Sequence, residues 1–164
     1  MSIRAQLYDA LRRSRRALLA AAHDLPEPLW YVPAAVGPWS VAEWFAIRIE
    51  AENRALTVVH SLHHGRPFLY DLPEAELDAH AVARRRGWSR DHLLRELYQQ
   101  REETMITLAA LTDEALARSY TVGDRVLSPL AVLMAVVAAE DELAARLRAW
   151  HTAHPPAGCE PAGG

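Results

Sequence analysis

The stretch Gly37-Pro38-Trp39-Ser40-Val41-Ala42-Glu43-Trp44-Phe45-Ala46-Ile47-Arg48-Ile49-Glu50-Ala51-Glu52 contains the start of a helix. Ser40 and Glu43 have the spacing of a capping box, in which each side chain accepts a hydrogen bond from a free backbone N–H at the helix start. Apolar residues then recur at intervals of three to five residues, which predicts one buried face. We expect this helix to end near Leu62, before Gly65.

Working outward, three further long amphipathic helices are predicted, at residues 2–23, 89–111 and 129–152. A proline-rich connection precedes the second helix, and a long crossover with a short helical piece at 74–85 follows it. This pattern is typical of an all-α four-helix bundle with a long crossover connection between helices 2 and 3. We expect one domain over residues 1–152 and a disordered tail over residues 153–164.

Charged residues divide into two groups by their expected positions. Most are expected to lie off the apolar faces, including Arg12, Arg13, Arg15 and Arg16 on the first helix and Glu43, Glu50, Glu52 and Arg54 on the second. Arg101 and Glu140 differ, because each interrupts an apolar stripe near the middle of its helix.

Composition excludes several functional classes. The formal net charge is −3 and the cationic residues are scattered among acids, so no nucleic-acid partner is expected. The longest apolar run, residues 130–139, is too short to span a membrane, and no export signal is recognised at the N-terminus. Cys159 is the one cysteine, so no internal disulfide forms, and a cytoplasmic location is expected.

Three motifs resemble the DinB/YfiT-like superfamily, and the resemblance covers about residues 5–150. They are Trp39-Ser40-Val41, Gly65-Arg66-Pro67 and Leu111-Thr112-Asp113-Glu114-Ala115-Leu116. This superfamily includes the amino-terminal domains of mycothiol-dependent maleylpyruvate isomerases and the ClbS/DfsB proteins. The resemblance implies a DinB-like bundle, a homodimer formed through helix faces, and chemistry that moves thiols or that isomerises or hydrolyses reactive small molecules.

The resemblance also implies where a metal would bind. Metal-binding members are expected to use one His on the second helix and a His-x-x-x-His pair on the fourth. The corresponding residues here are Ile47, Glu140 and Ala144. Ile47 and Ala144 cannot coordinate a metal, and a single carboxylate does not hold zinc or nickel. We therefore expect no metal site at these positions and no cofactor.

Glu140 must pair with a cation or bind a proton, because an isolated buried carboxylate is costly. Antiparallel neighbouring helices would bring it to the height of Arg101. One interpretation is a pocket in which Arg101 binds an anionic substrate and Glu140 is a general acid or base. The other is an internal ion pair in a vestigial site. In the first case the candidate ligand-binding residues are Trp44, Ile47, Ala144 and Tyr98.

Three functional hypotheses follow, and whether the protein is an enzyme stays open. The leading one is a metal-free protein that binds a small molecule in the bundle, in detoxification or stress response. The second is a non-catalytic dimerisation or interaction module. The third is a metal-dependent thiol transferase or hydrolase with relocated ligands, for which His60 and His64 have the i, i+4 spacing of a ligand pair.

Overall fold

The computed structural model describes residues 1–155 and is mostly helical, as the sequence predicts. In chain order the elements are α1 (Ile3–His23), the 3₁₀ helix η1 (Glu27–Tyr31), α2 (Val41–His63), α3 (Glu74–Arg84), α4 (Arg90–Ala109), α5 (Asp113–Ala117), β1 (Tyr120–Val122), β2 (Arg125–Leu127) and α6 (Pro129–Ala153). Cys159 and residues 156–164 of the predicted tail lie outside the described residues.

Hydroxyl side chains begin the helices where the sequence signals place them. The capping box at the start of α2 is formed on both sides. The backbone N–H of Glu43 donates to Ser40 Oγ at 3.2 Å, and the backbone N–H of Ser40 donates to Glu43 Oε2 at 2.7 Å. Single hydroxyl caps begin the other long helices, from Ser2, Ser89 and Ser128. These bonds satisfy backbone donors that have no partner within the helix.

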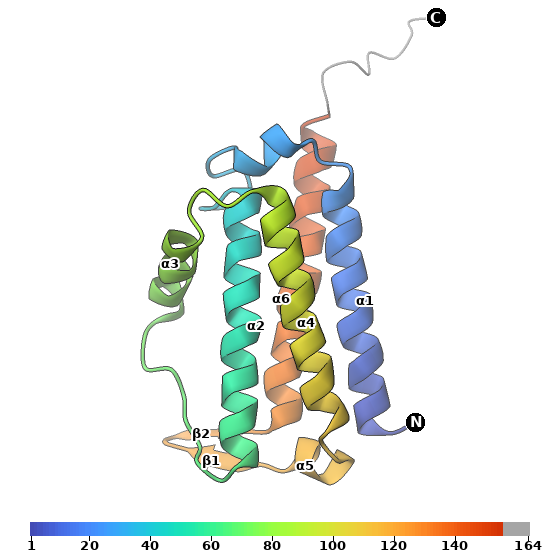
Figure 1. Ribbon diagram of the computed structural model, residues 1–164, viewed down its shortest axis with the longest axis vertical. Coiled ribbons are helices and arrows are strands. Elements are labelled where there is room, and N and C mark those ends of the chain that lie inside the picture. The colour runs from blue at the N-terminus through green and yellow to red at the C-terminus, as the bar shows by residue number, and fades with distance from the viewer. Residues whose placement is uncertain (156–164) are drawn as a thin grey trace, which may run out of the picture.

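The four long helices α1, α2, α4 and α6 lie side by side along the long axis of the molecule (Figure 1). α1 packs mainly against α6, and α2 packs against both α4 and α6. α5 and the antiparallel β1–β2 hairpin lie at one end of these helices. None of the described helices is long and apolar enough to cross a membrane.

The crossover between α2 and α4 carries α3, which lies against the outer side of α2 (Figure 1). Glu50 of α2 holds it there. Arg84 Nη1 donates to Glu50 Oε1 at 3.1 Å, and Arg85 Nη1 donates to Glu50 Oε2 at 2.8 Å. The C-terminal end of α3 is therefore anchored to α2 by charge.

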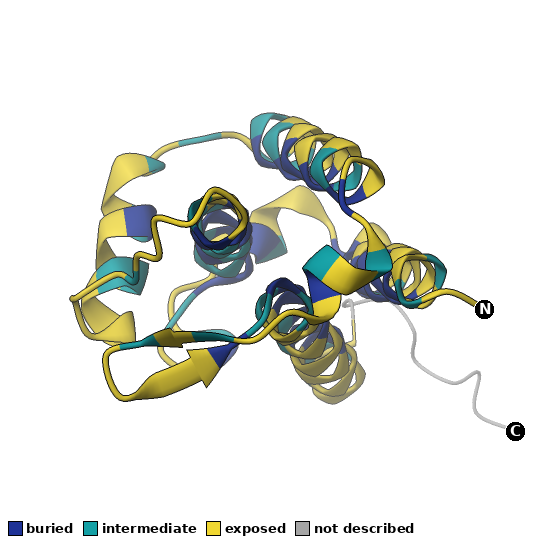
Figure 2. Cartoon of the chain, turned by 90° about the horizontal axis from the view of Figure 1, so that it is seen from below, coloured by how far each residue is buried: buried dark blue, intermediate teal, exposed yellow. Residues whose placement is uncertain are grey.

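Buried residues of the long helices face the interior (Figure 2). The apolar ones form two large clusters and a small third one of Val58, Leu62 and Leu127. One large cluster lies near η1 and includes Trp30 and Phe45, whose ring centroids are 4.6 Å apart. The other large cluster lies near α5 and includes Leu11, Leu108 and Leu133. Between them the core is polar, and the candidate residues Arg101 and Glu140 belong to that layer.

Candidate functional site

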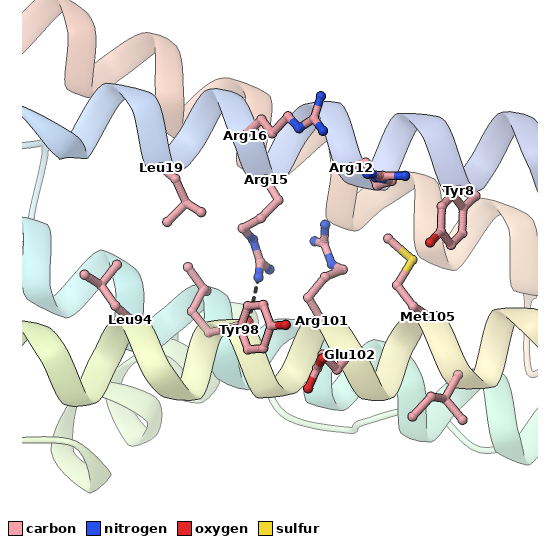
Figure 3. Close-up of a pocket in the computed structure, with 12 residues that line it drawn as sticks. Tyr8, Arg12, Arg15, Arg16, Leu19, Leu94, Tyr98, Arg101, Glu102 and Met105 are labelled. Carbon is pink, nitrogen blue, oxygen red and sulfur yellow. Dashed lines mark hydrogen bonds between the residues drawn. The ribbon is translucent and has the colours of Figure 1, made fainter.

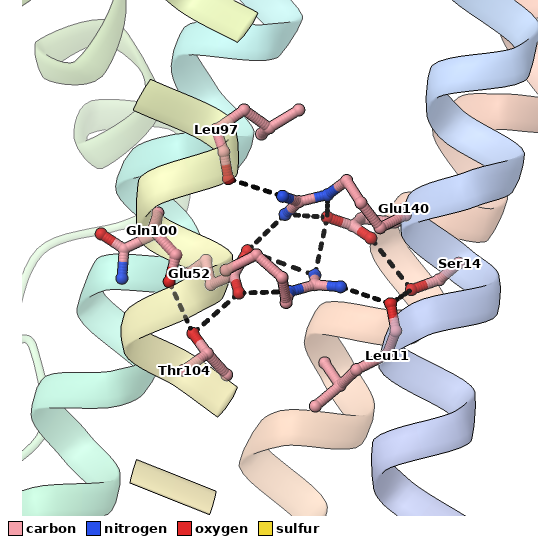
Figure 4. A network of polar contacts seen from close by, with 9 residues as sticks. Leu11, Ser14, Glu52, Leu97, Gln100, Thr104 and Glu140 are labelled. Carbon is pink, nitrogen blue, oxygen red and sulfur yellow. Dashed lines mark hydrogen bonds and ion pairs between the residues drawn. The ribbon is translucent and has the colours of Figure 1, made fainter. Parts of the chain in front are cut away.

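The polar layer contains two arginines and two glutamates, one from each long helix. They are Arg15 of α1, Glu52 of α2, Arg101 of α4 and Glu140 of α6. Each glutamate is 1% exposed and each arginine 7% exposed. Figure 4 shows that these side chains converge between the helices. The layer is neutral overall, which a buried charge cluster requires because unpaired charge in the interior is strongly destabilising.

Arg15 connects α1 to all three other long helices. Its Nε and Nη2 donate to Glu140 Oε1 at 2.9 and 2.6 Å. Its Nη2 also donates to Glu52 Oε2 at 2.5 Å, and its Nη1 donates to the carbonyl oxygen of Leu97 at 2.6 Å. A planar guanidinium can do this because its donors are fixed in a fork.

Arg101 makes the matching set of contacts from α4. Its Nε and Nη2 donate to Glu52 Oε1 and Oε2 at 2.7 and 3.2 Å, and Nη2 also donates to Glu140 Oε1 at 3.0 Å. Its Nη1 donates to the carbonyl oxygen of Leu11. The two arginines therefore brace α1 and α4 against each other in both directions.

Hydroxyl groups complete the layer. Ser14 Oγ donates to Glu140 Oε2 at 2.9 Å, and Thr104 Oγ1 donates to Glu52 Oε1 at 2.8 Å (Figure 4). Every carboxylate oxygen of the two glutamates thus accepts at least one hydrogen bond. A carboxylate with all its oxygens engaged is stabilised in the charged form and has no free oxygen facing a void.

Electrostatics favour the ionised forms of Glu52 and Arg101. Burial alone would raise the pKa of Glu52, but hydrogen bonds and positive charge from Arg101 and Arg15 outweigh it, so this pKa lies below its ordinary value. Burial likewise works to lower the pKa of Arg101. The hydrogen bonds and charges of Glu52 and Glu140 outweigh burial and raise that pKa. Both directions favour an ion pair between Glu52 and Arg101 at neutral pH.

The sequence analysis identified half of this network. Arg101 and Glu140 meet, as expected, but α4 and α6 are not packed as neighbours, and the two side chains reach each other across the middle of the helices. The expectation that Arg15 and Glu52 lie off the buried faces is wrong, because both are buried. Periodicity could have located them. Arg15 continues the stripe of Leu11 and Leu18, while Glu52 lies on α2 between two other buried residues, Ile49 and Leu56.

The candidate ligand-binding residues are not brought together in one hollow. Ile47 and Ala144 are fully buried in the core. Trp44 is half-buried, donates from Nε1 to the carbonyl oxygen of Val36 at 2.6 Å, and lines a small hollow of about 180 Å³ between α2, α3 and α6. Tyr98 lies elsewhere, on α4, and is 63% exposed.

The positions at which the resemblance implies metal ligands do not fit a metal. Two of them are the aliphatic side chains of Ile47 and Ala144, and the third, Glu140, is already held by two arginines. Within residues 1–155, no group of three or more His, Cys, Asp or Glu residues could hold a metal ion. His60 and His64 stack with ring centroids 6.3 Å apart, and no third His, Cys, Asp or Glu of residues 1–155 is grouped with them in a way that could hold a metal ion.

The sequence analysis did not identify a cleft of about 550 Å³ between α2, α3 and α6. One wall is formed by alanines, whose small side chains leave room between the helices: Ala51, Ala55, Ala131, Ala135 and Ala139. The opposite side is formed by crossover residues and β2, including Leu69, Tyr70, Leu72 and Val126. The signal in the sequence was the repeated alanine on facing sides of two long helices.

The charged side chains that line this cleft are Arg48, Arg54, Glu74 and Arg125, and those that line the small hollow beside it are Arg48, Glu74, Asp78, Glu142 and Arg146. Arg48 lines both and has no hydrogen-bond or ion-pair partner within residues 1–155, and its pKa is lowered chiefly by burial. Arg54 Nη2 lies 3.8 Å from Asp78 Oδ1, which is too long for a hydrogen bond, and both Arg54 Nη1 and Asp78 Oδ1 are buried without a partner. Burial also raises the pKa of Asp78. Buried polar groups without a partner are uncommon in folded proteins, and a bound ligand, ion or water would supply the missing partner here.

A second groove, of about 600 Å³, lies between α1 and α4 (Figure 3). Arg15 and Arg101 lie at its base, with their guanidinium groups engaged in the ion network. Its rim carries Arg12, Arg16, Tyr8 and Leu19 from α1, and Tyr98, Glu102 and Ile106 from α4.

No family model matches the sequence, and no curated protein matches it significantly. Solved structures do match in shape. The structure described as "Sibling Lethal Factor Precursor - DfsB" superposes with a TM-score of 0.80 at 15% identity, covering 94% of this chain and 98% of that chain. The chain shares the fold of DfsB.

Two uncharacterised proteins superpose equally well or nearly so. One, from Escherichia coli UTI89, has a TM-score of 0.80 at 15% identity and is matched over 92% of this chain and 93% of that chain. The other, from Clostridium difficile 630, has a TM-score of 0.78 at 16% identity, over 91% and 95%. At these identities the comparison with DfsB and its neighbours establishes the helical fold alone.

Proposed function

We propose that this chain is a metal-free, small-molecule-binding member of the DinB/YfiT-like superfamily with a DinB-like four-helix bundle. Its ligand site is the cleft between α2, α3 and α6. The ligand is an organic anion with an apolar body. The observation that carries this proposal is the half-buried Arg48 guanidinium, which faces the cleft without a partner in residues 1–155.

The shape and the chemistry of the cleft support this ligand class. A volume of about 550 Å³ lies within the usual range for small-molecule sites. The walls are mainly apolar, so they suit an aromatic or aliphatic body. At the polar end Arg48 and Arg54 offer guanidinium donors, which bind carboxylates with high directionality.

A protective role against reactive metabolites is part of the proposal. It derives from the resemblance of the sequence to the ClbS/DfsB proteins, and the shared fold of DfsB is consistent with it. A thermal-shift screen of small electrophiles and low-molecular-weight thiols addresses this role directly, because a ligand raises the unfolding temperature of the protein it binds.

The ligand class is tested by calorimetric titration of the full-length protein with 2-naphthoate and with its uncharged methyl ester. We expect the acid to bind more tightly than the ester. The Arg48→Met variant keeps the length of the side chain and removes its charge. It should weaken naphthoate binding by about tenfold or more, because a charge-assisted hydrogen bond is lost.

Arg148→Met is the matched control, since Arg148 is an exposed arginine of α6 outside the cleft. It should leave naphthoate affinity unchanged. Equal affinity for acid and ester, or an unchanged affinity in Arg48→Met, would overturn the proposed ligand class. Thermal unfolding of each variant confirms that it is folded.

The non-catalytic interaction module remains the second candidate, and the ion network favours it over catalysis by Glu140. Glu140 is bonded to Arg15, Arg101 and Ser14 instead of facing an empty pocket. For the third candidate, metal analysis of untagged protein is the test, because relocated ligands at His60 and His64 require stoichiometric zinc or nickel. We also propose that the chain forms a homodimer, which both leading functions permit.

A further inference from the structure

Exposed apolar side chains of considerable size gather on the groove between α1 and α4. Tyr8 and Leu19 contribute from α1, and Tyr98 and Ile106 from α4, with Ile106 71% exposed. Isolated surface hydrophobes are ordinary, but several that share one groove indicate a contact surface. Figure 3 shows the labelled residues of the two helices facing each other across this groove.

Charge on the same surface is divided between the two helices. Arg12 and Arg16 line the groove on α1, whereas Glu102 lines it on α4. Within residues 1–155, none of these three side chains forms an ion pair. A surface with a positive helix beside a negative one is complementary to a copy of itself.

The register of the two helices is known from the contacts across them. Arg15 Nη1 donates to the carbonyl oxygen of Leu97, and Arg101 Nη1 donates to that of Leu11, so α1 and α4 run antiparallel with these pairs level. Counting along both helices from these pairs, Arg12 is level with the segment between Tyr98 and Glu102. By the same count Tyr8 is level with the segment between Glu102 and Ile106, and Leu19 is level with Leu94.

We infer that this groove is the contact between two copies of the chain, related by a two-fold axis parallel to the long helices. Such an axis places α1 of one copy opposite α4 of the other. It leaves the position of every residue along the helix direction unchanged. The partner's Arg12 then lies between Tyr98 and Glu102, where it meets a carboxylate and an aromatic ring. The partner's Tyr8 lies beside Ile106, and the partner's Leu19 beside Leu94.

The charges also oppose the other simple arrangement. A two-fold axis that is perpendicular to the helices and crosses them near Arg12 and Arg16 places α1 opposite α1, so these arginines of one copy face the same arginines of the next. Like charges brought together in an interface cost several kcal/mol. The parallel axis instead gives each copy two equivalent sets of opposite-charge contacts, as a closed symmetric dimer requires.

This inference rests on the proposed homodimer and is independent of the ligand site, which lies between other helices. Sedimentation of the full chain over a range of concentrations gives the dimer dissociation constant. Arg12→Glu and Glu102→Arg should each raise that constant by about tenfold or more, since each puts like charges in contact. Combining the two substitutions should return the constant to within about threefold of wild type.

Arg148→Glu serves as the control, because Arg148 is exposed on α6 and does not line the groove. A wild-type chain that is monomeric at every concentration would overturn both the homodimer and its surface. If neither Arg12→Glu nor Glu102→Arg changes the dimer dissociation constant, the proposed contact surface is wrong although the dimer stands. The same holds if the double variant dimerises no more tightly than the single variants. The exchanged residues are at the exposed rim, so circular dichroism should show wild-type helix content in all variants.

Discussion

Arg15 and Glu140 form a buried ion pair between helices that are far apart in the sequence. Arg15 Nε and Nη2 both donate to Glu140 Oε1, at 2.9 and 2.6 Å, across a separation of 125 residues. This pair joins the first long helix to the last. Together with Glu52 and Arg101, it ties all four long helices at one height.

Glu140→Gln should destabilise the protein by about 3–5 kcal/mol, because two buried arginines would share a single carboxylate. The substitution keeps the shape of the side chain, so the loss reports on charge. Urea unfolding at neutral pH measures it. Glu142→Gln is the matched control on the same helix, since Glu142 is exposed and pairs with Arg146 at the surface. It should change stability by less than about 1 kcal/mol, and equal losses in the two variants would contradict a special role for Glu140.

Arg15→Met combined with Glu140→Met should cost less than the two single substitutions added together. Each single change leaves the layer with net charge, whereas the double change leaves the neutral pair of Glu52 and Arg101. We expect a coupling free energy of about 1–3 kcal/mol from a double-mutant cycle in urea. Additive losses would mean that Arg15 and Glu140 stabilise the fold independently.

Glu52→Gln should cost more stability at pH 7 than at pH 3. The pKa of Glu52 in the folded chain lies below its ordinary value of 4.5, so its ionised form stabilises the fold above that pH. This contribution is lost as the pH falls from 4.5 through the folded pKa, where the wild-type carboxyl gains a proton. Unfolding free energies of wild type and variant should therefore converge in acid. A difference that stays constant with pH would assign the loss to shape and neutral hydrogen bonding.

Ser40→Ala should destabilise the protein by about 1 kcal/mol, because the capping box at the start of α2 loses its hydroxyl acceptor for Glu43 N–H. Thermal unfolding followed by circular dichroism measures the effect. Ser119→Ala, at an exposed position between α5 and β1, should have almost none. A smaller loss in Ser40→Ala than in Ser119→Ala would show that the capping box does not position α2.

The helices themselves could be predicted because their signals are local. Ser40 with Glu43, Ser89, and Ser128 followed by Pro129 identify helix starts within a few residues, and apolar spacing identifies each buried stripe. Arg101 and Glu140 could be identified for the same reason, since each breaks an apolar stripe. Their pairing was expected from antiparallel neighbouring helices, whereas α4 and α6 are not packed against each other and the two side chains meet across the core.

Pairing within the core and the location of the cleft depend on the packing of distant segments. Arg15 and Glu52 continue apolar stripes, so periodicity can place them on buried faces, but it cannot say which distant side chains supply their counter-charges. The space at Arg48 likewise results from alanines of α2 and α6 lying opposite the crossover. The sequence alone determined where helices begin and which faces are apolar, because those signals act within a few turns. Only the tertiary structure decided which charges neutralise one another and which lack a partner, because that depends on helices brought together from opposite ends of the chain.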